Sequence, residues 1–126
     1  MRTLKVATMI GLAFAMPAFA QTGSPVSGEW TVDLRPDPNA PAYLKPMVIA
    51  VGSDGSITGT FYDHAIDKGR ASAVSGRACF AFRTFDDSGA YHTSGCLVGD
   101  QIEGQTWSEG RNFLLAWTAV RRGVSR

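Results

Sequence analysis

A histidine flanked by two aspartates is the most reactive grouping in this sequence. Asp63, His64 and Asp67 lie within one short stretch, and a histidine with two carboxylates can hold a metal ion or transfer protons. Loop residues of these types more often form turns that face solvent. Three potential ligands do not by themselves complete a site, so we expect no metal site here.

The sequence signatures of common enzymes are absent. The chain contains no Gly-x-Ser-x-Gly, no His-Glu-x-x-His and no phosphate-binding loop, which are the patterns that place a nucleophile, a zinc ion or a nucleotide. No adjacent nucleophile and base can be named from the sequence. We therefore expect a protein that is not an enzyme, with no catalytic residue and no cofactor.

Aromatic side chains are the other group that could do chemistry, by binding a ligand. Large aromatic rings line apolar pockets, and they fill hydrophobic cores equally well. Trp107 and Trp117 could line a cavity together with Tyr62 and Phe113, or fill it. The residues that we expect to form ligand walls, with Tyr43 as a lid, are Trp30, Tyr43, Phe61, Tyr91, Trp107 and Trp117.

The first 20 residues are typical of a signal peptide. Arg2 and Lys5 precede an apolar run, and Ala18-Phe19-Ala20 matches a small-residue cleavage site. Residues 21–126 then form one domain, and loss of the leader lowers the formal charge from +1 to −1. This balance argues against nucleic-acid binding. No later stretch is long and apolar enough for a membrane span, so we expect a periplasmic or secreted protein.

The two cysteines indicate a disulfide. In an oxidising compartment an even number of cysteines favours a bridge over free thiols. The segment 86–89, Asp-Asp-Ser-Gly, is a turn signal between two apolar runs, and a hairpin centred there places Cys79 opposite Cys96. The same hairpin places Arg83 opposite His92, as an exposed cross-strand pair.

Short strands dominate the rest of the chain. Glycines recur between β-branched and aromatic runs, and apolar residues alternate, as in Trp30, Val32 and Leu34. This pattern predicts eight strands, which are about Gly28 to Leu34, Met47 to Val51, Ser56 to Asp63, Arg70 to Ser75, Arg77 to Phe85, Ala90 to Val98, Gln101 to Ser108 and Phe113 to Arg122.

Tight turns between these runs imply that sequential strands pair antiparallel. Eight strands in a meander leave two exposed edges unless the sheet closes on itself. We therefore predict an all-β fold, an eight-stranded antiparallel up-and-down barrel. The alternative is a two-sheet β-sandwich, which normally needs longer crossover connections.

One connection is long and rich in proline. Residues 35–46 contain Pro36, Pro38, Pro41 and Pro46, so we expect an extended, stiff segment that is not a strand. It could be a lid over a barrel mouth, a docking surface for another protein or a rigid spacer.

The ends of the predicted barrel resemble those of the calycin superfamily, which includes lipocalins and avidins. The likeness rests on Gly28-Glu29-Trp30 in the first strand and on Arg121 or Arg122 at the end of the last. In calycins a basic side chain from the final strand covers the tryptophan, which is a favourable cation–π contact. The resemblance implies that Arg121, in phase with Leu115 and Trp117, covers Trp30.

A second stretch resembles the second hairpin of avidins. It runs over residues 52–61, from Gly-Ser-Asp-Gly to Gly-Thr-Phe. Avidins hold biotin with an asparagine and a tyrosine at positions where this chain has Val32 and Phe61. Because apolar groups cannot replace those hydrogen bonds, the resemblance implies the architecture and not biotin binding.

These observations favour an exported, non-catalytic binding protein for a small, partly apolar ligand. The alternative is a protein-interaction module that acts through residues 21–26 or the proline-rich loop. Small bacterial inhibitors of secreted metalloproteases are similar in size, export and barrel fold. The expected partner is thus a small molecule or another exported protein.

The leader generates the first testable prediction. We expect N-terminal sequencing of the protein from its own host to begin at Gln21, because Ala18-Phe19-Ala20 fits the specificity of signal peptidase. A chain that retains Met1 would contradict export by cleavage and would favour an N-terminal membrane anchor.

Overall fold

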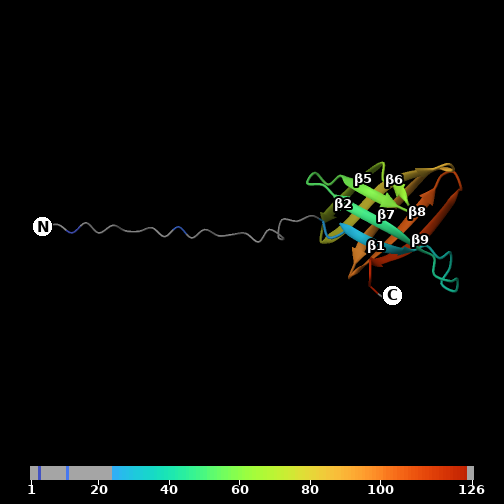
Figure 1. Cartoon of the computed structure of the whole chain (residues 1–126), viewed down its shortest axis with the longest axis horizontal. Helices are drawn as coiled ribbons and strands as arrows, with labels where there is room; N and C mark the ends of the chain where they lie inside the picture. Colours follow the sequence, from blue (N-terminus) through green and yellow to red (C-terminus); the bar gives the residue numbers. More distant parts are fainter. Residues whose placement is uncertain (1–2, 4–10, 12–23, 125–126) are drawn as a thin grey trace.

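A computed structural model describes residues 3, 11 and 24–124, so most of the predicted leader lies outside the described residues. The described part contains strands and turns, and it has no helix that could cross a membrane. The strands, most of which are labelled in Figure 1, are β1 (Gly28–Asp33), β2 (Leu44–Val51), β3 (Ile57–Phe61), β4 (His64–Ala65), β5 (Lys68–Val74), β6 (Arg77–Asp86), β7 (Gly89–Val98), β8 (Gln101–Ser108) and β9 (Phe113–Arg121).

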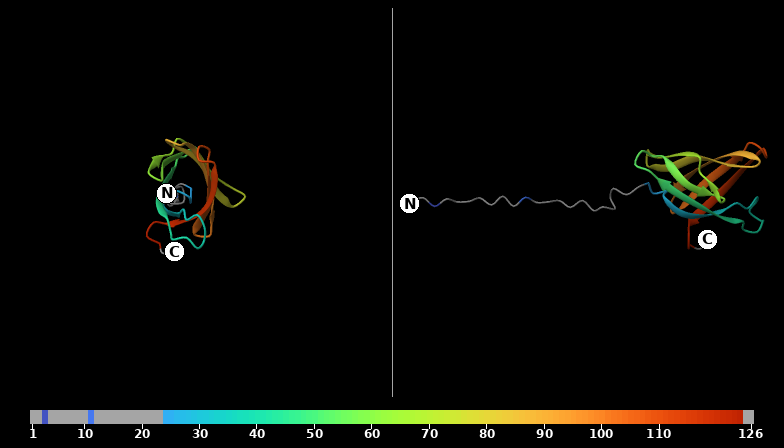
Figure 2. Two further views of the ribbon diagram at one scale, coloured as in Figure 1. Left: turned by 90° about the vertical axis from the view of Figure 1, so that its right-hand side faces the viewer. Right: turned by 45° about the horizontal axis from the view of Figure 1, so that its top comes forward.

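All nine strands belong to one antiparallel sheet in the order β4-β3-β2-β1-β9-β8-β7-β6-β5. The sheet is an up-and-down meander in which β1 also pairs with β9, and it curls into a half-barrel (Figure 2). Its free edges approach each other where Ser56 bridges Arg70 and the Ala71 amide donates to the Gly55 carbonyl at 2.8 Å. The predicted all-β, antiparallel up-and-down fold is confirmed, with a half-barrel in place of a closed eight-stranded barrel, and the strands do not form a two-sheet sandwich.

The structure has nine strands where eight were predicted. The predicted strand from Ser56 to Asp63 ends at Phe61, because Tyr62 and Asp63 have φ angles of 53° and 62° and form a tight turn. After this turn His64 and Ala65 form β4, which pairs back onto β3. The following strand begins at Lys68 and not at Arg70.

Part of the proline-rich segment was wrongly predicted to be outside any strand. Leu44, Lys45 and Pro46 belong to β2, and Pro46 lies opposite Thr31 of β1. In an antiparallel sheet the backbone N–H and C=O of one residue point toward the same neighbouring strand. The Pro46 carbonyl accepts from the Tyr62 amide at 3.3 Å, on the β3 side. The missing N–H therefore removes no hydrogen bond between β1 and β2.

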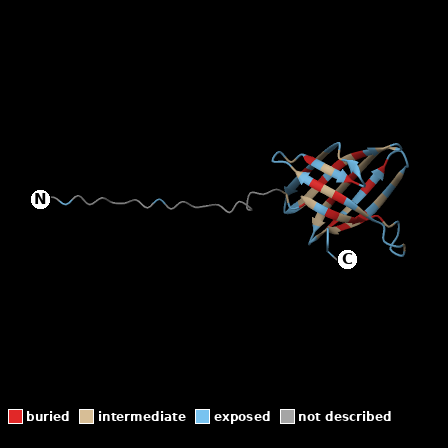
Figure 3. Ribbon diagram, viewed as in Figure 1, coloured by how far each residue is buried: buried red, intermediate tan, exposed pale blue. Residues whose placement is uncertain are grey.

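The core lies inside the curled sheet and is built from alternate residues of the strands. In Figure 3 buried and exposed positions alternate along the strands, as expected for strands with one face toward the core. The buried apolar side chains are Val26, Trp30, Val32, Leu34, Met47, Ile49, Ile57, Phe61, Ala71, Phe80, Phe82, Ile102, Trp117 and Ala119.

Trp30 and Arg121 close one end of the half-barrel. The Arg121 guanidinium lies 4.1 Å from the centre of the Trp30 ring and donates at 2.6 Å to the carbonyls of Pro25 and Ser27. The Trp30 indole N–H donates to the Val26 carbonyl at 2.9 Å. Residues 24–27 are thereby folded over this end, and Val26 is fully buried.

The predicted disulfide and its register are confirmed. Cys79 and Cys96 lie opposite each other on β6 and β7 and are bonded, with their Cα atoms 4.0 Å apart. Arg83 lies opposite His92, as the same hairpin required. On a loop-entropy estimate a bridge of this span contributes about 3 kcal/mol to stability.

The closed end generates a stability prediction. Arg121→Gln should lower the free energy of unfolding by about 2 kcal/mol, because it removes a cation–π contact and two charge-assisted hydrogen bonds. Urea unfolding followed by tryptophan fluorescence measures this change.

The neighbouring arginine provides a matched control. Arg122 is exposed and contacts Glu29 at 3.3 Å, so Arg122→Gln should change stability by about 0.5 kcal/mol or less. An equal loss of unfolding free energy in the two variants would show that Arg121 does not close this end.

Candidate functional site

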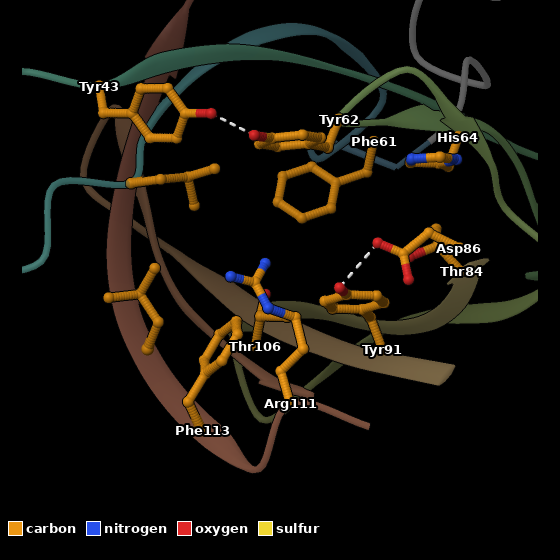
Figure 4. Close-up of a pocket in the computed structure, with 12 residues that line it drawn as sticks. Tyr43, Phe61, Tyr62, His64, Thr84, Asp86, Tyr91, Thr106, Arg111 and Phe113 are labelled. Atoms are coloured by element: carbon orange, nitrogen blue, oxygen red, sulfur yellow. Dashed lines mark hydrogen bonds between the residues drawn. The ribbon is translucent and has the colours of Figure 1, made fainter. Parts of the chain in front are cut away.

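A cavity of about 170 Å³ lies at the end of the half-barrel opposite Trp30. Figure 1 shows the loop between β1 and β2 at this end, away from the start of β1. The cavity is lined by side chains from most strands and from the turns at this end (Figure 4), namely Leu34, Tyr43, Phe61, Tyr62, His64, Thr84, Asp86, Tyr91, Thr106, Arg111, Phe113 and Leu115.

Aromatic rings fill the barrel below the cavity and set its depth. The Phe61 ring contacts Phe82 and Trp117, with ring centres 5.7 and 5.9 Å apart. Trp117 packs directly on Gly104 of β8, where any side chain would collide with the indole. Because these rings occupy the middle of the barrel, only its open end is left hollow.

Hydroxyl groups of threonine lie among these apolar walls. Trp117 donates its indole N–H to the Thr106 hydroxyl at 3.0 Å, and Thr106 also bonds Thr93 at 3.0 Å. Thr84 is only 4% exposed and lines the cavity. Its hydroxyl adds a second polar group to the cavity walls.

Two tyrosines meet above the cavity. Tyr43, just before β2, and Tyr62, in the β3–β4 turn, share a short hydrogen bond between their hydroxyls. This bond to Tyr43 is the main reason that the pKa of Tyr62 is raised. The Tyr62 ring also stacks on His64, and Lys45 Nζ lies 4.8 Å from its centre.

Asp86 is the acidic side chain among the residues that line the cavity. It accepts hydrogen bonds from the Tyr91 hydroxyl at 2.8 Å and from the Ser88 amide at 2.7 Å. The Tyr91 bond, followed by the Ser88 bond and the positive charge of nearby groups, lowers the pKa of Asp86. The carboxyl group is therefore ionised at neutral pH, and its oxygens are already hydrogen-bonded.

Arg111 extends from the β8–β9 turn into the cavity mouth (Figure 4). Its guanidinium lies 5.5 Å from the centre of the Phe113 ring. Within the part of the chain that the structure describes, no carboxylate lies within ion-pair distance of it, whereas Arg83 is paired with Asp67. Arg111 therefore brings a positive charge whose hydrogen-bond donors are open to a ligand.

Asp33 fixes the loop that carries Tyr43. Its carboxylate accepts the backbone amides of Arg35 and Tyr43, at 3.1 and 3.2 Å, and pairs with the Arg35 guanidinium at 2.6 Å. The hydrogen bond from the Arg35 side chain is the main reason that the pKa of Asp33 falls to about 2. One buried carboxylate thus holds both ends of the loop beside the cavity.

The structure brings together three of the six residues that were predicted as ligand walls. Tyr43, Phe61 and Tyr91 line the cavity, with Tyr43 at its mouth. Trp30 and Trp117 are buried in the core, Trp30 at the closed end and Trp117 beneath Phe61.

The structure does not bring Trp107 to this cavity. Its side chain is 46% exposed and stacks on His92 outside the barrel, with ring centres 5.2 Å apart. On β8 the inward positions are Ile102, Thr106 and Ser108, which are buried. Trp107 is in phase with Gln101, Glu103 and Gln105. These polar residues indicate that this side of β8 is the outer face of the barrel.

The histidine and its two aspartates are separated. His64 lines the cavity, while Asp67 binds the Arg83 guanidinium outside it. Asp63 is exposed in the β3–β4 turn. No three His, Cys, Asp or Glu side chains in the described ranges lie close enough to hold a metal ion.

Sequence reasoning missed Asp86, Arg111, Thr84 and Thr106 as cavity residues. In a meander of the eight predicted strands, alternate connections lie at the same end of the sheet, and this rule groups residues 35–46, 64–69, 86–89 and 109–112. Its use would have placed Arg111 and the end of β6 beside Tyr43. The two threonines could have been identified from strand alternation. The alternation that places Trp107 on the outer face of β8 places Thr106 on the inner face, and Thr84 is in phase with the buried Phe82 on β6.

Comparisons with protein-family models, with curated proteins and with solved structures gave no match to this chain.

The Asp33 contacts generate a pH prediction. A carboxyl group whose pKa is lower in the folded than in the unfolded protein stabilises the fold at pH values above its unfolded pKa. This stabilisation is lost as the pH falls through its folded pKa. With a pKa near 2 in place of 3.8, Asp33 contributes about 2 kcal/mol at pH 7. Asp33→Asn should lose this amount at pH 7, and the difference from the natural protein should shrink between about pH 4 and pH 2.

Urea unfolding at several pH values tests this, with Asp37→Asn as the control. Asp37 is exposed in the same loop, and its carboxylate accepts the Asn39 amide at 2.8 Å, a bond that asparagine can also accept. A pH-independent difference for Asp33→Asn would show that the Arg35 pairing does not stabilise the fold.

Proposed function

We propose that this chain is an exported, non-catalytic binding protein for a small, partly apolar ligand held in the open end of the barrel. The observation that carries the proposal is the cavity itself. Its walls are mainly apolar and aromatic, with a few polar groups from separate strands, and this composition is typical of ligand sites.

The cavity has both parts that such a ligand requires. Phe61, Phe113 and Leu115 supply apolar surface. Thr84 offers a hydroxyl group from a buried residue, and Arg111 offers charged donors at the mouth. A ligand with an apolar body and one or two polar groups matches this distribution.

Two observations support export. The sequence opens with a pattern that fits a signal peptide, and Cys79 and Cys96 are joined in a disulfide, which persists in oxidising compartments. Periplasm or extracellular space is therefore the location that we propose.

Exposure of the β1–β2 loop favours a second candidate function, docking of another exported protein. Residues 36–39 and 41–44 are exposed, and proline holds such a segment in an extended form that a partner can recognise. The other segment considered for this role is residues 21–26, of which 21–23 lie outside the described residues. Val26 is buried against the closed end, so this residue is occupied within the fold.

Native mass spectrometry of protein purified from its own host tests the binding proposal. We expect a discrete additional mass that is lost on unfolding. Leu115→Trp should abolish it, because Leu115 lines the cavity and a larger ring fills that space.

Leu114→Trp is the matched control, since Leu114 is the preceding residue on β9 and is 65% exposed on the outer face. It should keep the additional mass. Thermal unfolding of both variants establishes that they fold. A natural protein that carries no additional mass, or a mass retained in folded Leu115→Trp, would overturn cavity binding and favour the loop as the functional surface.

A further inference from the structure

The cavity mouth offers hydrogen-bond donors that a ligand can use. Tyr43 and Tyr62 use only one of their two hydroxyl hydrogens in the bond between them, so the other can be donated to a ligand. Arg111 has guanidinium N–H groups and no acceptor atoms. A ligand that satisfies this mouth must therefore present acceptors.

Both carboxylate oxygens of Asp86 at the mouth already accept a hydrogen bond. Asp86 receives the Tyr91 hydroxyl and the Ser88 amide, and no ion pair joins it to Arg111 among the described residues. Lys45 adds a second positive charge close to Tyr43 and Tyr62, with its Nζ 5.5 and 4.8 Å from the two ring centres. Arg111 and Lys45 together outweigh the single negative charge of Asp86, so the charges around the mouth are net positive and favour an anion over a neutral ligand.

The size of the cavity limits the apolar part of the ligand. An apolar cavity of about 150 Å³ holds benzene, and this one has a volume of about 170 Å³. Phe61 and Phe113 face the hollow from β3 and β9 (Figure 4), so a flat ring could pack against aromatic surface there.

We propose that the ligand is a small carboxylic acid with one ring, whose ring enters the cavity and whose carboxylate binds Arg111 at the mouth. This inference rests on the proposed function and adds the chemical class. Arg111 can donate two parallel hydrogen bonds to a carboxylate, and the free hydroxyl hydrogen of the Tyr43–Tyr62 pair can supply another.

Two probes of the same shape test the charge requirement. Phenylacetate and phenylacetamide differ in charge and share the ring and its linker. Titration of each into nitrogen-15-labelled protein, followed by NMR, should give a dissociation constant for phenylacetate about tenfold lower. Shifts of the amides around Arg111 and Phe113 locate the binding site.

Arg111→Gln should raise the dissociation constant of phenylacetate to that of phenylacetamide and leave the amide probe unchanged. The backbone amide of residue 111, which donates to Ser108 Oγ at 3.1 Å, is retained in this variant. Arg122→Gln is the matched control because Arg122 pairs with Glu29 and does not line the cavity. It should leave both constants unchanged.

The outcomes separate this inference from the proposed function. Equal binding of the two probes, or a preference for phenylacetate that persists in Arg111→Gln, would overturn the acid-binding role and leave cavity binding in place. If neither probe binds, a ring-sized acid is excluded, while the additional mass and its loss in Leu115→Trp still decide whether the cavity holds a ligand.

Discussion

Arg121 lies over the indole of Trp30 and binds two carbonyls of the segment before β1, and this contact joins the last strand to the first. It accompanies the β1–β9 pairing that connects the two halves of the meander. It also holds residues 24–27 across one end of the half-barrel. That end is filled by Trp30 and Val26, and the cavity lies at the other end, beside the β1–β2 and β8–β9 connections.

The fold was predictable where local chemistry determines register. The Asp-Asp-Ser-Gly turn set the β6–β7 pairing, and the opposed cysteines agreed with it. Prediction failed at Tyr62, whose positive φ ends β3 early, since tyrosine gives no signal for that conformation. It also failed at Pro46, because whether a strand can contain a proline depends on which neighbouring strand the missing N–H would have faced.

The site was predictable only in part, because residue type was given more weight than strand parity. Tyr43, Phe61 and Tyr91 line the cavity, and each was chosen for its ring. Trp107 was chosen for the same reason and faces outward. Arg111 was overlooked because an arginine in a turn is usually solvated. Its place at the mouth follows from the way alternate turns gather at one end of the curled sheet, which single motifs do not reveal.

The strand order also has a consequence for how the chain folds. Cys79 and Cys96 are 17 residues apart in one hairpin, and the other neighbouring strands are equally local in sequence. The pairing of β1 with β9 instead requires contact between the two ends of the domain, which has the largest loop-closure entropy and is the slowest kind of contact to form. The hairpins can therefore form, and the disulfide can oxidise, before the two ends meet. In that order of events the cavity takes shape only at the final step, after the hairpins that carry its lining residues have formed.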